Sequence, residues 1–376
     1  MSLREVREPL ERWTREGSRA AVATLVAVKR SAPRPPGARF AVNESGELAG
    51  SVSSGCVEGD LHEHLLGILA GAPPAILHYG ITDELAAEVG LACGGEIDVL
   101  VALHEPDDPV WPALGDALDR VRPAVLLTGL SEEVRARRLL LTEDGVVVGS
   151  LGSPGLDEAA RRMARGLFDA EGTTILEWPL EDPGRRSSRP ADEAVPLVRA
   201  FAEVYLPPPR LAIIGATPVA AALCHIAAYA GVSVTIIDPR PALADPEKFP
   251  AADRVLHAWP EEGLSELGAD RYLGVVALAH DRKLDVPALA AALRAGCLYV
   301  GQIGGRRTQR LRREALAELG FDDAELTRIH GPVGLDIGAE TPEEIALAVL
   351  AEWIAVRRGR KPRRTSSPPG PVASGE

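Results

Sequence analysis

Short apolar runs alternate with helix-like segments through the second half of the chain, and this alternation constrains the fold more than any other feature. The runs LAIIGA, VSVTIID, LGVVALA and CLYVGQIG have the length and β-branched content of buried strands. Strands that alternate with helices predict a parallel sheet covered on both faces. We therefore predict a doubly wound, Rossmann-like domain over residues 209–357. The helical patterns lie at about 219–230, 287–295, 308–319 and 342–356.

The first part of the chain, residues 8–180, instead mixes helices and strands without a regular alternation. Residues 181–208 begin with a stretch that is too polar and too rich in proline and arginine for a core, so we predict a linker there. Residues 358–376 are first basic and then rich in serine and proline, which predicts a disordered tail. The predicted class is thus α/β, with an N-terminal mixed α+β domain followed by the Rossmann-like domain.

Composition and charge exclude several classes of function. A formal net charge of -13 argues against general nucleic-acid binding, which needs a surplus of basic residues. The charged first residues lack the apolar stretch of a signal peptide, so we predict a cytoplasmic protein. Residues 211–237 are apolar enough for a membrane span, but Gly215, Pro218 and Gly231 interrupt them, which favours a buried strand, helix and strand.

One cysteine follows a serine- and glycine-rich bend. In the stretch GSVSSGCVEGD, Cys56 comes directly after Ser53, Ser54 and Gly55, at the predicted start of a helix. The positive end of a helix dipole lowers the pKa of a thiol and favours the nucleophilic thiolate. This setting makes Cys56 a candidate reactive thiol.

A second cysteine lies in another glycine-rich bend. Cys93 is followed by Gly94 and Gly95, which would leave the thiol open to approach by a large ligand. Cys224 and Cys297 lie in apolar runs, where core packing explains them. Four cysteines in a chain of 376 residues do not form a disulfide framework, and no zinc-ligand spacing occurs.

The first strand of the Rossmann-like domain ends in a partial dinucleotide fingerprint. Gly215 and Ala220 occupy the first and last positions of the G-x-G-x-x-G/A pattern, and Asp238 ends the next strand as the acid that would bind a ribose hydroxyl. Thr217 replaces the middle glycine, which normally lets the backbone approach a pyrophosphate. The turn therefore supports the fold and leaves NAD(P), another nucleotide and a pterin phosphate open as ligands.

A polar cluster follows a later strand, in the stretch ALAHDRKLD. The carboxyl ends of parallel strands form the ligand crevice of such sheets, so His280, Asp281 and Lys283 are well placed for function. A purely structural alternative is that Asp285 caps a helix beginning at Pro287.

The next strand runs into a glycine- and arginine-rich turn. Gly304 and Gly305 allow successive N–H groups to face an anion, and Arg306 and Arg307 add the charge that a phosphate needs. The alternative is a tight turn with solvated arginines. Asp336, in the glycine-rich loop before the last helix, would face the same crevice.

Seven motifs occur together and in a fixed order. They are SAPRPPGARF, GSVSSGCVEGDL, GLACGG, IIGATPVA with IIDPRP, HDRKLD, YVGQIGGRR and HGPVGLDIGAETPEEIALAVLAEW. Over about residues 10–357 this set resembles the XdhC/CoxI family of accessory factors for molybdenum hydroxylases such as xanthine dehydrogenase and carbon monoxide dehydrogenase. The resemblance implies a protein that binds and protects the molybdenum cofactor, assists its sulfuration and delivers it to the apo-hydroxylase.

Two departures from the family pattern fall in the predicted crevice. Members usually have G-A-G-H-V-A where this chain has Gly215-Ala216-Thr217-Pro218-Val219-Ala220, so the middle glycine and the histidine are missing. Ala279 replaces the usual threonine before the His-Asp pair. Both changes bear on the ligand rather than on the fold.

The resemblance leads to our first hypothesis, a cofactor-binding and delivery factor rather than an enzyme. The cofactor, a molybdopterin with or without a nucleotide, would lie between the cysteine-bearing region and the carboxyl edge of the Rossmann sheet. Cys56 or Cys93 would contact molybdenum or accept sulfur in transit. The remaining expected binding residues are Ser53, Ser54, Gly55, Gly94, Gly95, Gly215, Thr217, Asp238, His280, Asp281, Gly304, Gly305, Arg306, Arg307 and Asp336.

The expected partner is an apo molybdenum hydroxylase, and a cysteine desulfurase and a second copy of the chain are further candidates. One competing hypothesis is an NAD(P)-dependent oxidoreductase with His280 as proton donor and Lys283 as substrate anchor. Another is a structural partner of a hydroxylase complex that has lost cofactor binding.

Overall fold

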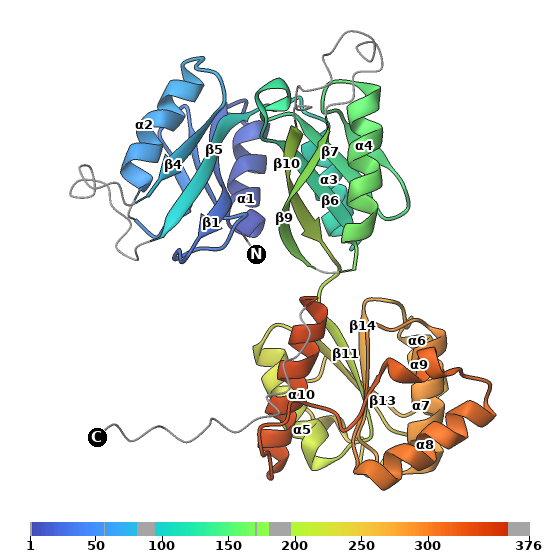
Figure 1. The fold of residues 1–376 in the computed structure, drawn as a ribbon. Helices are drawn as coiled ribbons and strands as arrows, with labels where there is room; N and C mark the ends of the chain where they lie inside the picture. The colour runs from blue at the N-terminus through green and yellow to red at the C-terminus, as the bar shows by residue number, and fades with distance from the viewer. Residues whose placement is uncertain (1, 56, 81–94, 170, 180–196, 360–376) are drawn as a thin grey trace, which may run out of the picture. The chain divides into compact units, whose positions relative to one another are not determined.

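The chain forms two compact units, Met1–Leu206 (unit 1) and Pro207–Glu376 (unit 2) (Figure 1). Within the described ranges, no helix combines the length and the apolar composition that a membrane crossing requires. The computed structural model describes residues 2–55, 57–80, 95–169, 171–179 and 197–359.

Unit 1 begins with an antiparallel sheet of five strands, the first sheet, in the order β3-β2-β1-β5-β4. Helix α1 packs on one face of it and α2 on the other, because each helix places its apolar residues on one side. The bounds are α1 Ser2–Arg15, β1 Ala20–Lys29, β2 Arg39–Asn43, β3 Leu48–Gly50, α2 Glu58–Leu69, β4 Ala75–Tyr79 and β5 Glu96–His104.

A second antiparallel sheet has the order β8-β7-β6-β10-β9. Its strand β10 (Leu197–Tyr205), between β6 and β9, lies within the segment predicted as a linker. Most side chains of β10 are buried between its neighbours, so this part of the segment is a strand rather than a linker. The other bounds are α3 Val110–Asp119, β6 Ala124–Gly129, η1 Glu132–Val134, β7 Arg138–Thr142, β8 Val147–Gly149, α4 Pro154–Ala164, η2 Arg165–Leu167 and β9 Gly172–Pro179.

The two halves of unit 1 are structural repeats of each other. Each runs helix, three strands, helix, two strands, and the two sheets have equivalent strand orders. At the ends of β3 and β8, Gly50 and Gly149 have φ +74° and +86°, and a Cβ on either would lie within 2.4 Å of the carbonyl oxygen of Arg39 or Arg138. Both pairs are separated along the chain by the same number of residues. This repeat was not predicted from the sequence.

The sheets of unit 1 meet through equivalent residues and through a buried ion pair. Arg39 of β2 donates from Nη2 to Glu203 Oε2 of β10 at 2.6 Å, and both side chains are almost fully buried. Tyr205 donates to the other oxygen of Glu203 at 3.1 Å. The apolar cluster at this junction takes matching positions from both repeats: Val26 with Leu130, Ile76 with Ile175, and Leu100 with Phe201.

Unit 2 is a parallel sheet of six strands in the order β13-β12-β11-β14-β15-β16, which confirms the predicted doubly wound fold. Helices α5 and α10 cover one face, and α6, α7 and α8 cover the other (Figure 1). The bounds are β11 Arg210–Ile214, α5 Pro218–Tyr229, β12 Ser233–Ile237, η3 Pro246–Lys248, β13 Arg254–Leu256, α6 Pro260–Glu266, β14 Leu273–Ala277, α7 Arg282–Arg294, β15 Tyr299–Gln302, α8 Arg306–Glu318, α9 Asp323–Thr327, β16 Ile329–His330 and α10 Pro342–Arg357.

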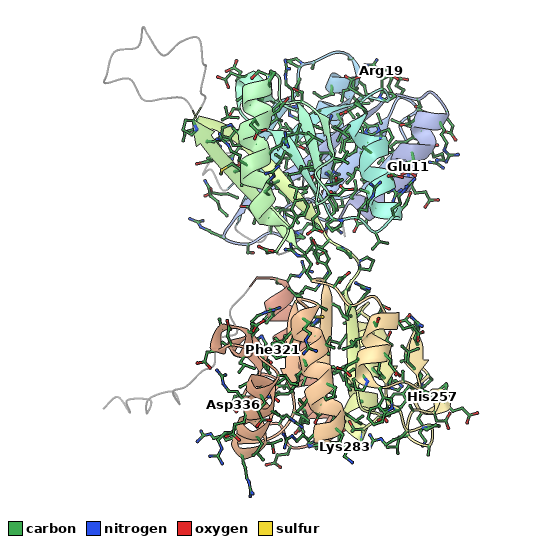
Figure 2. The ribbon with its side chains drawn as sticks, turned by 90° about the vertical axis from the view of Figure 1, so that its right-hand side faces the viewer. Glu11, Arg19, His257, Lys283, Phe321 and Asp336 are labelled. Atoms are coloured by element: carbon green, nitrogen blue, oxygen red, sulfur yellow. The ribbon has the colours of Figure 1, made fainter. Side chains whose placement is uncertain are left out.

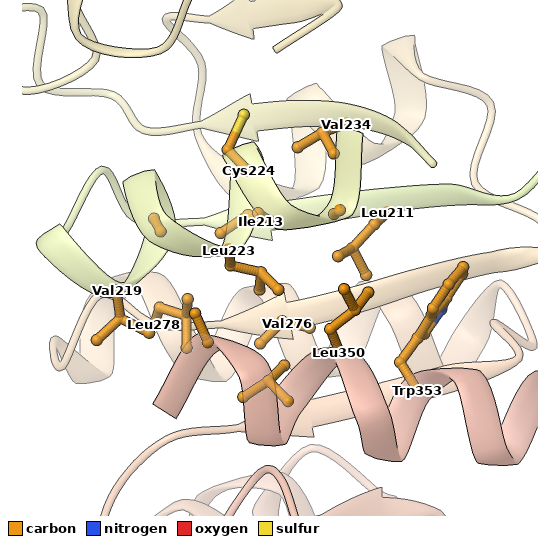
Figure 3. Packing of buried hydrophobic residues seen from close by; sticks show 14 of the residues in the cluster. Leu211, Ile213, Val219, Leu223, Cys224, Val234, Val276, Leu278, Leu350 and Trp353 are labelled. Carbon is orange, nitrogen blue, oxygen red and sulfur yellow. The ribbon is translucent and has the colours of Figure 1, made fainter. Parts of the chain in front are cut away.

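The apolar residues 211–237, which were long enough to suggest a membrane span, form part of the core of unit 2. Residues 211–237 form β11, α5 and β12, whose side chains are buried against the sheet and against α10. Figure 3 shows Leu350 and Trp353 of α10 packed beside Leu211 and Val276 of the sheet. Cys224 of α5 lies in this core, as predicted from its apolar surroundings.

Candidate functional site

In unit 1, the serine-rich bend before α2 wraps around the carboxylate of Glu58. The hydroxyl groups of Ser51 and Ser53 each donate to it at 2.6 Å, and Ser53 is buried. The backbone N–H groups of Gly55 and Val57 donate to Oε2 at 2.8 and 3.3 Å. Cys56 itself lies outside the described residues, but both of its chain neighbours are therefore held by one carboxylate.

The Glu58 carboxylate changes the electrostatic setting predicted for the thiol. Helix α2 begins at Glu58, with Val57 as its N-cap residue, so Cys56 precedes the helix. Partial burial opposes ionisation of Glu58, but hydrogen bonds from Ser51, Ser53 and backbone N–H groups outweigh it and lower its pKa to about 2. The hydroxyl and N–H donors of this bend are thus bound to a negative charge.

The second repeat contains the same bend without a cysteine. Asp157, the equivalent of Glu58, accepts from the hydroxyl of Ser150 at 2.8 Å and from the N–H of Leu151 at 2.7 Å. Gly155 stands where the first repeat has Cys56. Both repeats therefore have a bend whose hydroxyl and N–H groups bind one carboxylate, which we call the carboxylate clamp. Only the first repeat has a cysteine in this bend.

The second cysteine bend is described only at its end. Cys93 and Gly94 lie outside the described residues, while Gly95 is buried beside the loop after β1. A Cβ on Gly95 would lie 1.7 Å from the carbonyl oxygen of Ser31. Close packing of two backbones accounts for this glycine, which we had attributed to ligand access.

In unit 2, Asp238 follows β12 and its carboxylate is fully used inside the chain. Oδ1 accepts from the N–H and Nε of Arg240 at 3.0 and 2.8 Å. Oδ2 accepts from Nη2 of Arg240 at 2.6 Å and from the N–H of Ala216 at 2.8 Å. Burial raises the pKa of Asp238, but these bonds outweigh burial and lower it overall. A carboxylate has about four lone-pair sites, so none remains for a ribose hydroxyl.

Two positions of the turn after β11, Gly215 and Thr217, have a structural explanation. Gly215 has φ +100°, and a Cβ there would lie 2.6 Å from Cα of Ala279, just after β14. Thr217 is the N-cap of α5 and accepts from the N–H of Ala220 at 3.2 Å. Gly215 therefore lies beside the residue that precedes His280, which brings two of the predicted motifs together at the carboxyl edge of the sheet.

The polar cluster after β14 contains the start of helix α7, but the helix begins earlier than predicted and has a different cap residue. Helix α7 begins at Arg282, and its cap is Asp281, which accepts from the N–H of Lys283 at 2.9 Å. The expectation that Asp285 caps a helix starting at Pro287 is wrong, because both residues lie inside α7. His280 is exposed with φ +56°, and Figure 2 shows Lys283 at the lower end of unit 2.

Asp285 instead forms a buried ion pair that the sequence analysis missed. Its Oδ2 accepts from Nη2 of Arg312, and Nη1 of Arg312 donates to the carbonyl oxygen of Ile303. Arg312 is 2% exposed and Asp285 is fully buried. The pair fixes the loop between β15 and α8 to α7. Arg312 shares a helical face with the buried Ala315 and Leu316, which was a detectable sign of burial.

The glycine- and arginine-rich turn forms the start of α8. Gly304 has φ +121°, and Gly305 is the N-cap, which has no side chain to cap the helix. The N-caps of α5, α7 and α10 are Thr217, Asp281 and Thr341, each of which accepts a backbone N–H. The first N–H groups of α8 therefore lack a side-chain cap, which leaves them for an anion.

The loop before α10 is fixed to the sheet by a buried glutamate. Glu352 of α10 accepts from the Tyr299 hydroxyl at 2.6 Å and from the N–H of Gly334 at 2.8 Å, and it contacts His330 Nδ1 at 3.2 Å. Asp336, in the same loop, is exposed; Figure 2 shows it in the lower half of unit 2, as it does Lys283. Among the described residues, no group of three His, Cys, Asp or Glu side chains could hold a metal ion.

A separate hollow of about 400 Å³ lies between α1 and α3 in unit 1. It is lined partly by His104, whose pKa burial and the charge of Arg138 lower to about 4. This imidazole is therefore neutral at pH 7. None of the predicted site residues lines the hollow, and we do not assign the predicted chemistry to it.

Two family models match this chain, one in each unit. Residues 211–353 match a family model described as the XdhC Rossmann domain, and residues 13–80 match the model of the XdhC and CoxI family. The chain belongs to the XdhC and CoxI family. The resemblance seen in the seven sequence motifs is thereby confirmed.

Relatives of this XdhC/CoxI protein match it over most of its length. A probable xanthine dehydrogenase subunit of Bacillus subtilis (strain 168) is 28% identical over 346 residues, covering 90% of this chain and 93% of that protein. The molybdenum cofactor insertion chaperone PaoD of Escherichia coli (strain K12) is 27% identical over 341 residues, covering 91% and 84%. A crystal structure described as a xanthine dehydrogenase from Bacillus halodurans has a TM-score of 0.63 at 24% identity, over 97% of this chain and 98% of that one, which shows the fold.

Proposed function

We propose that this chain is a maturation factor that binds the molybdenum cofactor and delivers it to a molybdenum hydroxylase of the xanthine dehydrogenase type. The observation that carries the proposal is the start of α8, where N–H groups without a side-chain cap lie next to Arg306 and Arg307. The phosphate of molybdopterin, alone or as a dinucleotide, fits this donor set. The family membership and the names of two relatives support the same role.

The thiols supply the sulfur chemistry in this proposal. Cys56 or Cys93 contacts molybdenum or takes a sulfane sulfur from the persulfide of a cysteine desulfurase. In that exchange the accepting thiolate forms a new S–S bond, and the donor cysteine leaves as a thiolate, so no external oxidant is needed. Gly55 and Val57, held by Glu58, fix the backbone on both sides of Cys56.

The competing oxidoreductase hypothesis loses its main support. It relied on Asp238 to bind a ribose hydroxyl, and that carboxylate already accepts four hydrogen bonds from Ala216 and Arg240. A nicotinamide dinucleotide would have to displace a bidentate arginine to gain this contact. We therefore keep cofactor delivery as the proposed function.

The test is co-expression with an apo-hydroxylase, followed by measurement of molybdenum and pterin in the purified chain and of hydroxylase activation. The Cys56→Ala/Cys93→Ala variant should lose activation of the hydroxylase, whereas Cys224→Ala, which removes a core thiol, should retain it. Full activation by the double variant would refute the role of the thiols. Absence of molybdenum and pterin from the wild-type chain would refute the proposed function.

The desulfurase and a second copy of the chain remain predictions. Pull-down with a cysteine desulfurase and light scattering of the purified chain check them. We expect capture of the desulfurase to depend on Cys56 or Cys93 if sulfur passes between the two proteins.

A further inference from the structure

A basic groove runs along α8 on the side that faces β16. It has a volume of about 280 Å³. Arg306, Arg310 and Arg313 line it from successive turns of α8, because residues three and four apart share one face of a helix. Gly331, after β16, lines the opposite wall. Of these residues, only Arg306 belongs to the site predicted from the sequence.

Gln302 lies at the end of β15 and also lines the groove. Its side chain is only 5% exposed, yet its Oε1 has no hydrogen-bond partner among the described residues. Burying an amide without partners costs free energy, so buried amides are normally hydrogen-bonded. Gln302 Nε2 would lie 3.0 Å from a Cβ on Gly331, which places the amide at the glycine wall of the groove. An amide can rotate to present its N–H₂ group to a ligand.

The groove has more positive charge than the chain itself neutralises. Arg313 pairs with Asp323 at 2.8 Å, and Arg310 forms a longer, exposed ion pair with Glu314 at 3.7 Å. Arg306 has neither an ion pair nor a hydrogen bond within the described part of unit 2. Arg306 is thus unpaired among the described residues, and Arg310, whose ion pair uses Nε, keeps its Nη groups for an anion, next to the Gln302 amide.

We infer that this groove is a binding subsite for a doubly charged phosphoryl group. Arg306 and Arg310 bind its oxygens, and guanidinium groups suit phosphate because they donate two parallel hydrogen bonds. Gln302 donates a further hydrogen bond from its amide, and the uncapped N–H groups of α8 lie beside Arg306. The phosphoryl group is either free phosphate or the phosphate monoester of the cofactor. Only the second of these sources rests on the proposed function.

The test compares variants of the full chain by calorimetric titration with inorganic phosphate, at constant ionic strength and at a pH where phosphate is doubly charged. Arg306→Gln/Arg310→Gln removes the unpaired charge of Arg306 and the weakly paired charge of Arg310. Arg120→Gln/Arg162→Gln is the matched control, because it removes two exposed charges from unit 1. Gln302→Met keeps the volume of the buried side chain and removes its amide.

We expect the wild type and the control to bind phosphate equally. The groove double variant should bind at least about tenfold more weakly, since hydrogen bonds to charged groups contribute about that factor or more each. Gln302→Met should weaken binding by about fivefold without lowering the melting temperature, because it removes a buried amide whose oxygen lacks a partner in the described ranges. Equal affinity of the groove variant and the control, or no binding by the wild type, would overturn the inference.

A second arm identifies the source of the phosphate. The same variants are loaded with molybdenum cofactor and assayed for molybdenum and pterin. Loss of both ligands in the groove double variant identifies the cofactor phosphate, and loss of inorganic phosphate alone identifies free phosphate. If the wild type binds no cofactor, the proposed function fails while the phosphate titration still decides the subsite.

Discussion

At the scale of single residues, Glu58 is the side chain on which the cysteine bend depends. One carboxylate gathers two serine hydroxyls and several backbone N–H groups within a few residues of Cys56. Hydrogen bonds to a charged acceptor are about twice as strong as neutral ones. The conformation of the bend is therefore linked to the ionisation of Glu58.

We predict that Glu58→Gln destabilises unit 1 by about 1–2 kcal/mol at pH 7, after allowance for solvent at this partly exposed group. The folded-state pKa of about 2 is below the unfolded value of about 4.5, so ionised Glu58 stabilises the fold above pH 4.5. This contribution is lost as the pH falls from about 4.5 toward 2. Urea unfolding at several pH values measures it.

The control for this prediction is Glu63→Gln, an exposed carboxylate on the same helix. It should change the free energy of unfolding by less than about 0.5 kcal/mol at any pH. If Glu58→Gln and Glu63→Gln behave alike, the clamp does not stabilise the bend.

At the scale of elements, α7 and α8 are joined by the buried pair of Asp285 and Arg312. Because Arg312 also donates to the carbonyl oxygen of Ile303, it sets where the proposed phosphate-binding turn begins. The position of Gly304 and Gly305 thus depends on a side chain that would not itself touch the ligand.

We predict that Arg312→Met destabilises unit 2 by about 3–5 kcal/mol, because it leaves a buried carboxylate without its partner. Adding Asp285→Leu should restore most of that loss, since two apolar side chains can replace a buried pair. Arg313→Met, which breaks an exposed pair, should cost less than about 1 kcal/mol. Denaturant unfolding tests all three, and equal effects of Arg312→Met and Arg313→Met would contradict the prediction.

The sequence predicted best those elements that can be recognised from their own residues, without knowledge of distant partners. β11, β12, β14 and β15 are apolar on both faces, which is typical of strands in a covered parallel sheet. The start of α7 was misplaced, because Pro287 is tolerated inside that helix. β10 was missed because its partners β6 and β9 come from earlier in the chain. Arg312 and Glu352 were missed because their partners are distant in sequence.

At the scale of the whole molecule, the apolar clusters of the described residues are confined to one unit or the other. Each unit buries its own core, which is the physical requirement for independent folding. The candidate thiols belong to unit 1, and the proposed phosphate-binding turn belongs to unit 2.

We predict that residues 1–206 and 207–359, expressed separately, each unfold cooperatively. Each piece should melt within about 4 °C of the corresponding transition in the full chain, because no described cluster is cut. Calorimetry of the pieces and of the full chain measures this. A piece that shows no cooperative transition would mean that its core needs the other unit.

The repeat in unit 1 has a consequence for how such a unit can arise. Its junction pairs Leu100 with Phe201 and Ile76 with Ile175, as the self-complementary interface of a symmetric dimer would. Unit 1 is thus built like two protomers fused into one polypeptide, the product that tandem gene duplication leaves. After such a fusion the two copies can diverge, as they do where Cys56 and Gly155 occupy equivalent positions of the two bends.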